Sequence, residues 1–126
     1  MRRGIALAIA TSLALAIPAG VAVAGDRDVI REGPCSGSSD WKLKLSPENG
    51  RIEVEFEVDQ NVVGDRWRVK ILHDGDRVFA GTRTTRGASG SFELRIVEND
   101  RAGSDDFRAR ARNLSTDEIC WGGATF

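Results

Sequence analysis

Apolar and polar residues alternate along most of this chain, which is the pattern of strands that bury one face. The clearest run is 51–59, where Ile52, Val54, Phe56 and Val58 alternate with acidic residues. Similar runs cover 41–45, 66–71, 77–85, 92–96, 107–112 and 118–126. Turn-forming residues separate these runs at roughly 8–12 residue intervals, and no helical periodicity is sustained after the first 24 residues. The pattern predicts an all-β domain of about seven antiparallel strands, a sandwich or a small barrel.

Two of these runs narrow the fold further. Trp67 lies in the third expected strand, and the run 107–113 forms the sixth. Together with the strand count, they make residues 40–126 resemble an immunoglobulin-like or fibronectin type III-like β-sandwich. The resemblance implies that the third, fourth, sixth and seventh strands share one sheet. The chain departs from antibody domains because Phe56 and Ala109 lie where their paired cysteines would be.

The first 24 residues have the layout of a secretory signal peptide. Arg2 and Arg3 precede the uncharged apolar stretch 4–17, and small residues at 22–24 fit a cleavage site after Ala24. The alternative is a membrane anchor, but the apolar stretch is short for one. We therefore expect an exported chain with no membrane segment after cleavage, similar to a small secreted bacterial protein. We expect residues 25–39 to form a loose polar N-terminal segment, here called the lead, before the β-sandwich domain at 40–126.

The two cysteines, Cys35 and Cys120, stand near opposite ends of the expected mature chain. An even number of cysteines in an oxidising compartment favours a disulfide. A metal-binding pair and a catalytic thiol are the alternatives, but the spacing matches no metal motif. We expect one disulfide between Cys35 and Cys120.

Composition limits the classes of function. The chain carries 18 Lys and Arg residues against 19 Asp and Glu residues. This balance is unlike that of polybasic nucleic-acid binders, so we expect no nucleic-acid specificity. The high charged fraction is also unlike that of a membrane bundle.

Cross-strand register can be anticipated because side chains on paired strands must face the same side. For the first hairpin we expect Leu45 to oppose Ile52, with Ser46 to Gly50 as the turn. For the last hairpin we expect three pairs: Ala111 with Cys120, Ala109 with Gly122, and Phe107 with Ala124. The orientation of Phe79 stays open, because a bulge near Asp74-Gly75 would reverse it.

The same alternation sorts charges onto faces. In an immunoglobulin-like strand order, one outer face would carry Arg66, Arg68, Lys70, Arg108, Arg110 and Arg112, with Trp121 among them. The other outer face would carry mostly acids, such as Glu53, Glu55, Glu57, Asp59 and Glu93. We select Trp121, Arg110, Arg108, Arg66 and Arg68 as the candidate binding residues. The alternatives are a private stack of Trp121 on Arg110 and ordinary solvation of a strand face.

Recognisable catalytic chemistry is sparse. His73 is the only histidine, and Gly87 to Ser91 is not a serine-nucleophile motif. Asp105 and Asp106 read as loop residues that point apart. A single histidine argues against zinc, whereas calcium stays open at the aspartates of the turns around residues 74–76 and 99–106. We expect no catalytic residue, no metal and no cofactor.

These observations predict a secreted, monomeric, non-enzymatic binding module. Its expected partner is an anionic polymer or an acidic protein surface. One alternative is an inhibitor of an extracellular enzyme, acting through the loops 61–65 or 87–90. Another is a small hydrolase with an unfamiliar site.

Overall fold

The computed structural model describes residue 25 and residues 27–126 of the chain, so the predicted signal peptide lies outside the described residues. The strands in chain order are β1 (Val29–Pro34), β2 (Asp40–Glu48), β3 (Arg51–Asp59), β4 (Arg66–His73), β5 (Asp76–Thr84), β6 (Ser91–Asn99), β7 (Asp106–Asn113) and β8 (Ile119–Thr125). Among the described residues there is no helix long and apolar enough to cross a membrane.

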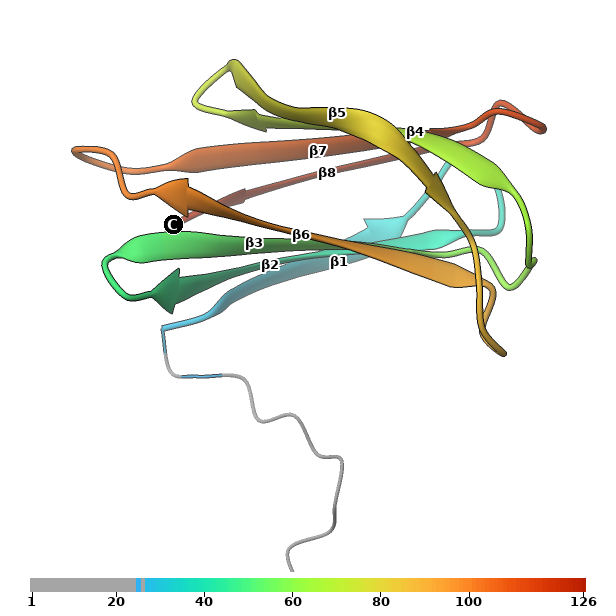
Figure 1. The fold of residues 1–126 in the computed structure, drawn as a ribbon, viewed down its shortest axis with the longest axis horizontal. Helices are drawn as coiled ribbons and strands as arrows, with labels where there is room; N and C mark the ends of the chain where they lie inside the picture. Colours follow the sequence, from blue (N-terminus) through green and yellow to red (C-terminus); the bar gives the residue numbers. More distant parts are fainter. Residues whose placement is uncertain (1–24, 26) are drawn as a thin grey trace, which may run out of the picture.

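The strands form two antiparallel sheets that pack as the layers of a sandwich (Figure 1). One sheet has the order β1-β2-β3-β6, and the other has the order β5-β4-β7-β8. The predicted all-β sandwich is therefore confirmed. So is the expected grouping of the third, fourth, sixth and seventh strands, which are β4, β5, β7 and β8.

The core lies between the sheets and is built from the inward positions of the alternating runs. Trp67 on β4 is fully buried and meets Phe92 on β6 with ring centroids 6.1 Å apart. The inward positions of β3 are fully buried as well, from Ile52 to Val58. On β8 the Trp41 ring packs directly over Gly122, so any larger side chain at this position would displace Trp41.

The lead before the domain contains a strand that the sequence pattern did not predict. Val29–Pro34 forms β1 and pairs with β2 from Val29 opposite Leu45 to Pro34 opposite Asp40. The domain therefore has eight strands rather than seven. Apolar and polar residues do not alternate along β1, and none of its residues is fully buried. Hydrophobic periodicity therefore gave no signal for this strand.

The register expected for the first hairpin is wrong by two residues. Leu45 opposes Val54, and Pro47 opposes Ile52. The turn consists of only Asn49 and Gly50, both with positive φ (49° and 77°), which is the signature of a tight two-residue hairpin. Pro47 fits in the strand because β1 pairs with β2 only as far as Leu45.

The last hairpin has the expected register. Ala111 opposes Cys120, Ala109 opposes Gly122 and Phe107 opposes Ala124. The open question of Phe79 is also resolved: the ladder shifts at Ile71/Leu72, so that Phe79 opposes Ile71 and packs against the core.

A disulfide joins Cys35 to Cys120, as predicted. It ties the segment after β1 to β8 in the opposite sheet. The Glu118 carboxylate reinforces this link, because it accepts hydrogen bonds from the backbone N–H groups of Gly37 (2.9 Å) and Ser39 (2.9 Å). The link therefore holds the two sheets together at one edge of the sandwich.

Replacing Cys35 and Cys120 together with Ala should lower the free energy of unfolding by about 4 kcal/mol, because the crosslink spans 85 residues and restricts the unfolded chain. Urea unfolding followed by Trp fluorescence measures the change. Reducing agent should destabilise the parent chain to the same extent and leave the variant unaffected. A loss below about 1 kcal/mol would contradict the proposed importance of the crosslink.

Candidate functional site

The outer face of the β5-β4-β7-β8 sheet gathers the residues selected from the sequence. We call the outward cations of β4 and β7 the basic face: Arg66, Arg68, Lys70, Arg108, Arg110 and Arg112. Their inward neighbours fill the core, so alternation alone directs these side chains to solvent. All five predicted binding residues lie on this face, on three adjacent strands.

Pairing between β4 and β7 places like charges directly opposite each other. Arg68 opposes Arg112, and Lys70 opposes Arg110. Like charges in such positions destabilise a sheet. Arg108 is paired with Asp106 (3.2 Å) and Arg112 with Asp117 (3.0 Å). Arg68, Lys70 and Arg110 form no ion pair with any carboxylate of the described residues, so the centre of the face carries uncompensated positive charge.

Trp121 lies on β8 beside this centre. It directly opposes Arg110, as expected, and its side chain is 57% exposed. The cation over its ring is nevertheless Arg108, whose guanidinium carbon lies 5.7 Å from the ring centroid. The alternative in which Trp121 stacks on Arg110 is therefore wrong, because the stacked cation is Arg108. Most of the indole remains accessible to a ligand.

The surface between the cations is shallow. Arg68, Lys70, Arg110 and Arg112 line a groove of about 170 Å³. Drug-sized ligands usually occupy pockets of about 300–1,000 Å³, so this groove is too small to enclose one. Outward positions on a strand repeat about every 6.7 Å, so the three cations of each strand extend over roughly 13 Å. The face is therefore suited to an extended ligand that lies across it.

The outer face of the other sheet shows how charges are compensated elsewhere in the molecule. Lys44 opposes Glu55 and Lys42 opposes Glu57, although Glu57 also opposes Glu93. A hydrogen bond from Arg95 (2.6 Å) lowers the pKa of Glu53 to about 2. On this face Lys44 and Arg95 form ion pairs with neighbouring carboxylates, whereas the cations at the centre of the basic face form none among the described residues.

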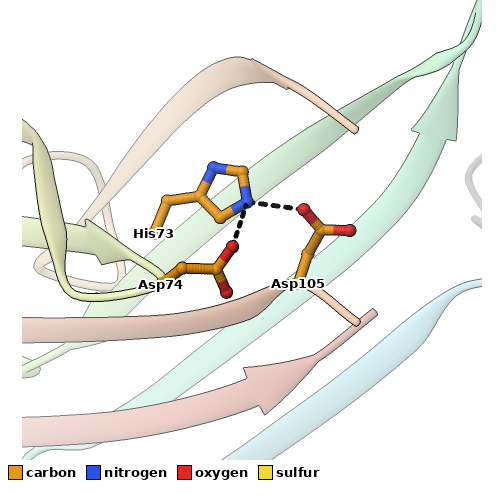
Figure 2. Close-up of side chains that lie close together, drawn as sticks. All are labelled: His73, Asp74 and Asp105. Carbon is orange, nitrogen blue, oxygen red and sulfur yellow. Dashed lines mark hydrogen bonds and ion pairs between the residues drawn. The ribbon is translucent and has the colours of Figure 1, made fainter. Parts of the chain in front are cut away.

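A second polar site lies at the end of the sandwich where β4 ends and β7 begins. Its central residue is His73, whose ring is fully buried and stacks on Phe107 with centroids 4.2 Å apart. The ring Nε2 lies 2.6 Å from an oxygen of Asp105, and Nδ1 lies 3.0 Å from Glu98 (Figure 2 shows the Asp105 and Asp74 side). We call His73, Asp74, Glu98 and Asp105 the His73 cluster.

Hydrogen bonds link the side chains of this cluster. Both ring nitrogens of His73 lie within hydrogen-bond distance of carboxylate oxygens, and ionised carboxylates only accept hydrogen bonds. Burial alone would raise the pKa of Asp105, but hydrogen bonds from His73 and the Arg101 backbone N–H outweigh burial and hold that pKa below its usual range. The neighbouring Asp105 carboxylate raises the pKa of Asp100.

Sequence reasoning missed this cluster. It treated Asp105 as a solvated loop residue, whereas the side chain is 1% exposed. Asp105 and Asp106 do point apart, but Asp105 points inward. The cluster draws on three separate segments, so no local spacing reveals it. The sequence did single out the histidine beside the Asp74-Gly75 turn and, for calcium, the aspartates of the turns around 74–76 and 99–106, but it did not show that these segments meet.

Removing the Asp105 carboxylate should destabilise the domain. Asp105→Ala would leave the buried His73 ring without the nearer of its two carboxylate partners. Breaking a buried ion pair typically costs about 3 kcal/mol or more. Urea unfolding at neutral pH measures the difference. Asp106→Ala is the matched control, because its side chain points outward and should cost less than about 1 kcal/mol. Equal losses for the two variants would contradict a structural role for the cluster.

Comparisons of the chain with protein-family models, with curated proteins and with solved structures gave no match.

Proposed function

We propose that this chain is an exported, non-enzymatic binding module that holds an anionic polymer against its basic face. The observation that carries the proposal is the pairing of Arg68 with Arg112 and of Lys70 with Arg110. If these residues only kept the sheet soluble, alternating charges would do so at a lower cost in stability. A row of repeated anions would offset the repulsion that the sheet itself leaves uncompensated.

Shape favours a polymer over a compact ligand. The face is broad and shallow, and its cations repeat along two adjacent strands. An extended polyanion can therefore contact several of them at once. The exposed ring of Trp121 adds a flat apolar platform at the side of the array, on which a sugar ring could lie.

The fold and the disulfide support the rest of the proposal. Sheets ordered β1-β2-β3-β6 and β5-β4-β7-β8 are consistent with an immunoglobulin-like or fibronectin type III-like frame, a scaffold that many cell-surface domains share. Disulfides form and persist in oxidising compartments, which is consistent with export.

Charge reversal on the basic face tests the proposal. We expect Arg68→Glu/Arg110→Glu to abolish retention on a heparin column at low salt. The dissociation constant for heparin oligosaccharides should also be measured at several salt concentrations. The slope of log Kd against log salt should be smaller in the variant than in the parent chain by about 2, because two cation–anion contacts are lost.

The matched control is Lys42→Glu/Arg51→Glu, which makes the same change in net charge on the other sheet. It should retain binding, because the proposed contacts lie on the opposite face. Trp121 emission should respond to heparin in the parent chain, and Trp121→Phe should remove that response. Equal loss in both double variants would show that net charge alone drives retention and would overturn the proposal. Binding to acidic proteins but to no polysaccharide would identify a protein surface as the partner instead.

The second candidate function is inhibition of an extracellular enzyme. The loop between β3 and β4 exposes two adjacent apolar side chains, Val62 (49%) and Val63 (63%). Exposed apolar residues on a supported loop are typical of protein contacts. The loop is anchored, because the Gly64 N–H donates to the Thr85 carbonyl (2.9 Å).

Val62→Ser/Val63→Ser separates the two functions. If the loop inserts into an enzyme, this variant should lose inhibition in a panel of secreted proteases and glycosidases, while its heparin binding stays unchanged. Inhibition that survives in this variant, or the absence of inhibition by the parent chain, would contradict the loop hypothesis.

A further inference from the structure

Three side chains with metal-binding atoms converge at the His73 cluster. His73 Nε2, an oxygen of Asp74 and an oxygen of Asp105 all lie within 4.8 Å of one another. Figure 2 shows one oxygen of Asp74 and one oxygen of Asp105 directed toward the same nitrogen of the His73 ring. Imidazole nitrogens and carboxylate oxygens are both among the atoms that bind zinc in proteins.

A second observation concerns Asp105. This residue is 1% exposed, and one of its oxygens, Oδ2, is buried without any hydrogen-bond partner. Most buried side-chain oxygens in folded proteins have a protein or water partner, and a bound ion is one explanation for an oxygen that has none. Acids also outnumber cations around the site: Asp74, Asp76, Glu98, Asp100 and Asp105 lie near His73, Arg101 and Arg27.

The far side of the imidazole is arranged as it is in metal-binding histidines. His73 Nδ1 lies 3.0 Å from a carboxylate oxygen of Glu98. A ligating histidine usually donates its other ring N–H to a carboxylate, which fixes the tautomer and directs the free nitrogen at the metal. Burial of the ring and its stack on Phe107 hold this orientation.

From this geometry we propose that the His73 cluster binds one Zn²⁺ ion through His73 Nε2, Asp74 and Asp105, with Glu98 as a positioning residue. Ligand atoms about 2.0–2.2 Å from a tetrahedral zinc lie roughly 3.4 Å apart. The 3.6 Å between Nε2 and the Asp74 oxygen already fits this spacing. The Nε2 and Asp105 oxygen atoms, now 2.6 Å apart, would have to separate by about 0.8 Å to reach this spacing. Zinc would take the place of the proton between these two atoms, and that proton would pass to solvent.

Access to the site is through Asp74. Its side chain is 31% exposed, whereas His73 and Asp105 are buried. Water can therefore complete the coordination from the Asp74 side. Arg101 lies beside this opening: its guanidinium bonds Asp76 (2.9 Å) and the His73 carbonyl (3.2 Å) and forms a longer ion pair with Asp74 (3.7 Å), which zinc would replace.

Zinc titration of the mature, disulfide-bonded chain tests the proposal. His73 is the only histidine, so its ring signals in ¹H–¹⁵N NMR report on this site alone. We expect a saturable shift of the Nε2 signal with one zinc per chain, observed by NMR and calorimetry. We also expect the melting temperature to rise by about 10 °C when zinc exceeds Kd a hundredfold. Calcium and magnesium should leave the His73 signals unchanged, because they prefer oxygen ligands alone.

Asp74→Asn is the informative variant, because its partly exposed side chain can still accept the hydrogen bond from the Asp106 backbone N–H. It should weaken zinc binding at least tenfold. The matched control, Asp106→Asn, removes the same charge from a neighbouring side chain that pairs with Arg108, and should bind zinc like the parent. Absence of a saturable His73 shift at millimolar zinc, or equal affinity in Asp74→Asn, would overturn the proposal. The outcome of the zinc titration does not depend on whether the basic face binds heparin, because the two sites use different residues.

Discussion

The functional account depends on the register between β4 and β7, because that register places cation against cation on the outer face. The ladder is fixed at both ends by side-chain contacts between the two segments. At one end Asn113 on β7 donates to Asp65, which precedes β4 (2.9 Å). At the other end His73 on β4 stacks on Phe107 on β7. A shift by two residues would break both sets of contacts, so the repulsion between cations cannot relax by sliding the strands.

The two sides of the sandwich therefore differ in more than the sign of their charges. On the β1-β2-β3-β6 side, ion pairs such as that of Glu53 with Arg95 offset part of the charge within the protein. On the basic face, the outward cations of the central strands have mostly each other as neighbours. Proteins commonly retain such unfavourable arrangements where a ligand needs them, at the expense of stability. The disulfide and the apolar core supply the stability that makes this arrangement tolerable.

Much of the fold and of the basic face could be predicted from the sequence, because period-two alternation determines which side chains share a face. The small residues Ala109, Ala111 and Gly122 also fixed the register of the last hairpin correctly. The first hairpin was misjudged, because Pro47 suggested a turn that the Asn49-Gly50 pair actually forms.

Other features were beyond sequence reasoning for physical reasons. Strand β1 is held by backbone pairing and by the crosslink after it rather than by a buried apolar stripe. The His73 cluster forms only when three separate segments meet at one end of the sandwich. Nothing in the local pattern distinguishes the buried Asp105 from its exposed neighbour Asp106.

The most direct test of the account is a map of the amide chemical-shift changes that a heparin oligosaccharide causes in the ¹⁵N-labelled chain. The account predicts that the largest changes fall on β4, β7 and β8, centred on Lys70, Arg110 and Trp121, with little change on β2 and β3. Changes centred on the β1-β2-β3-β6 sheet, or spread evenly over all exposed lysines and arginines, would contradict it.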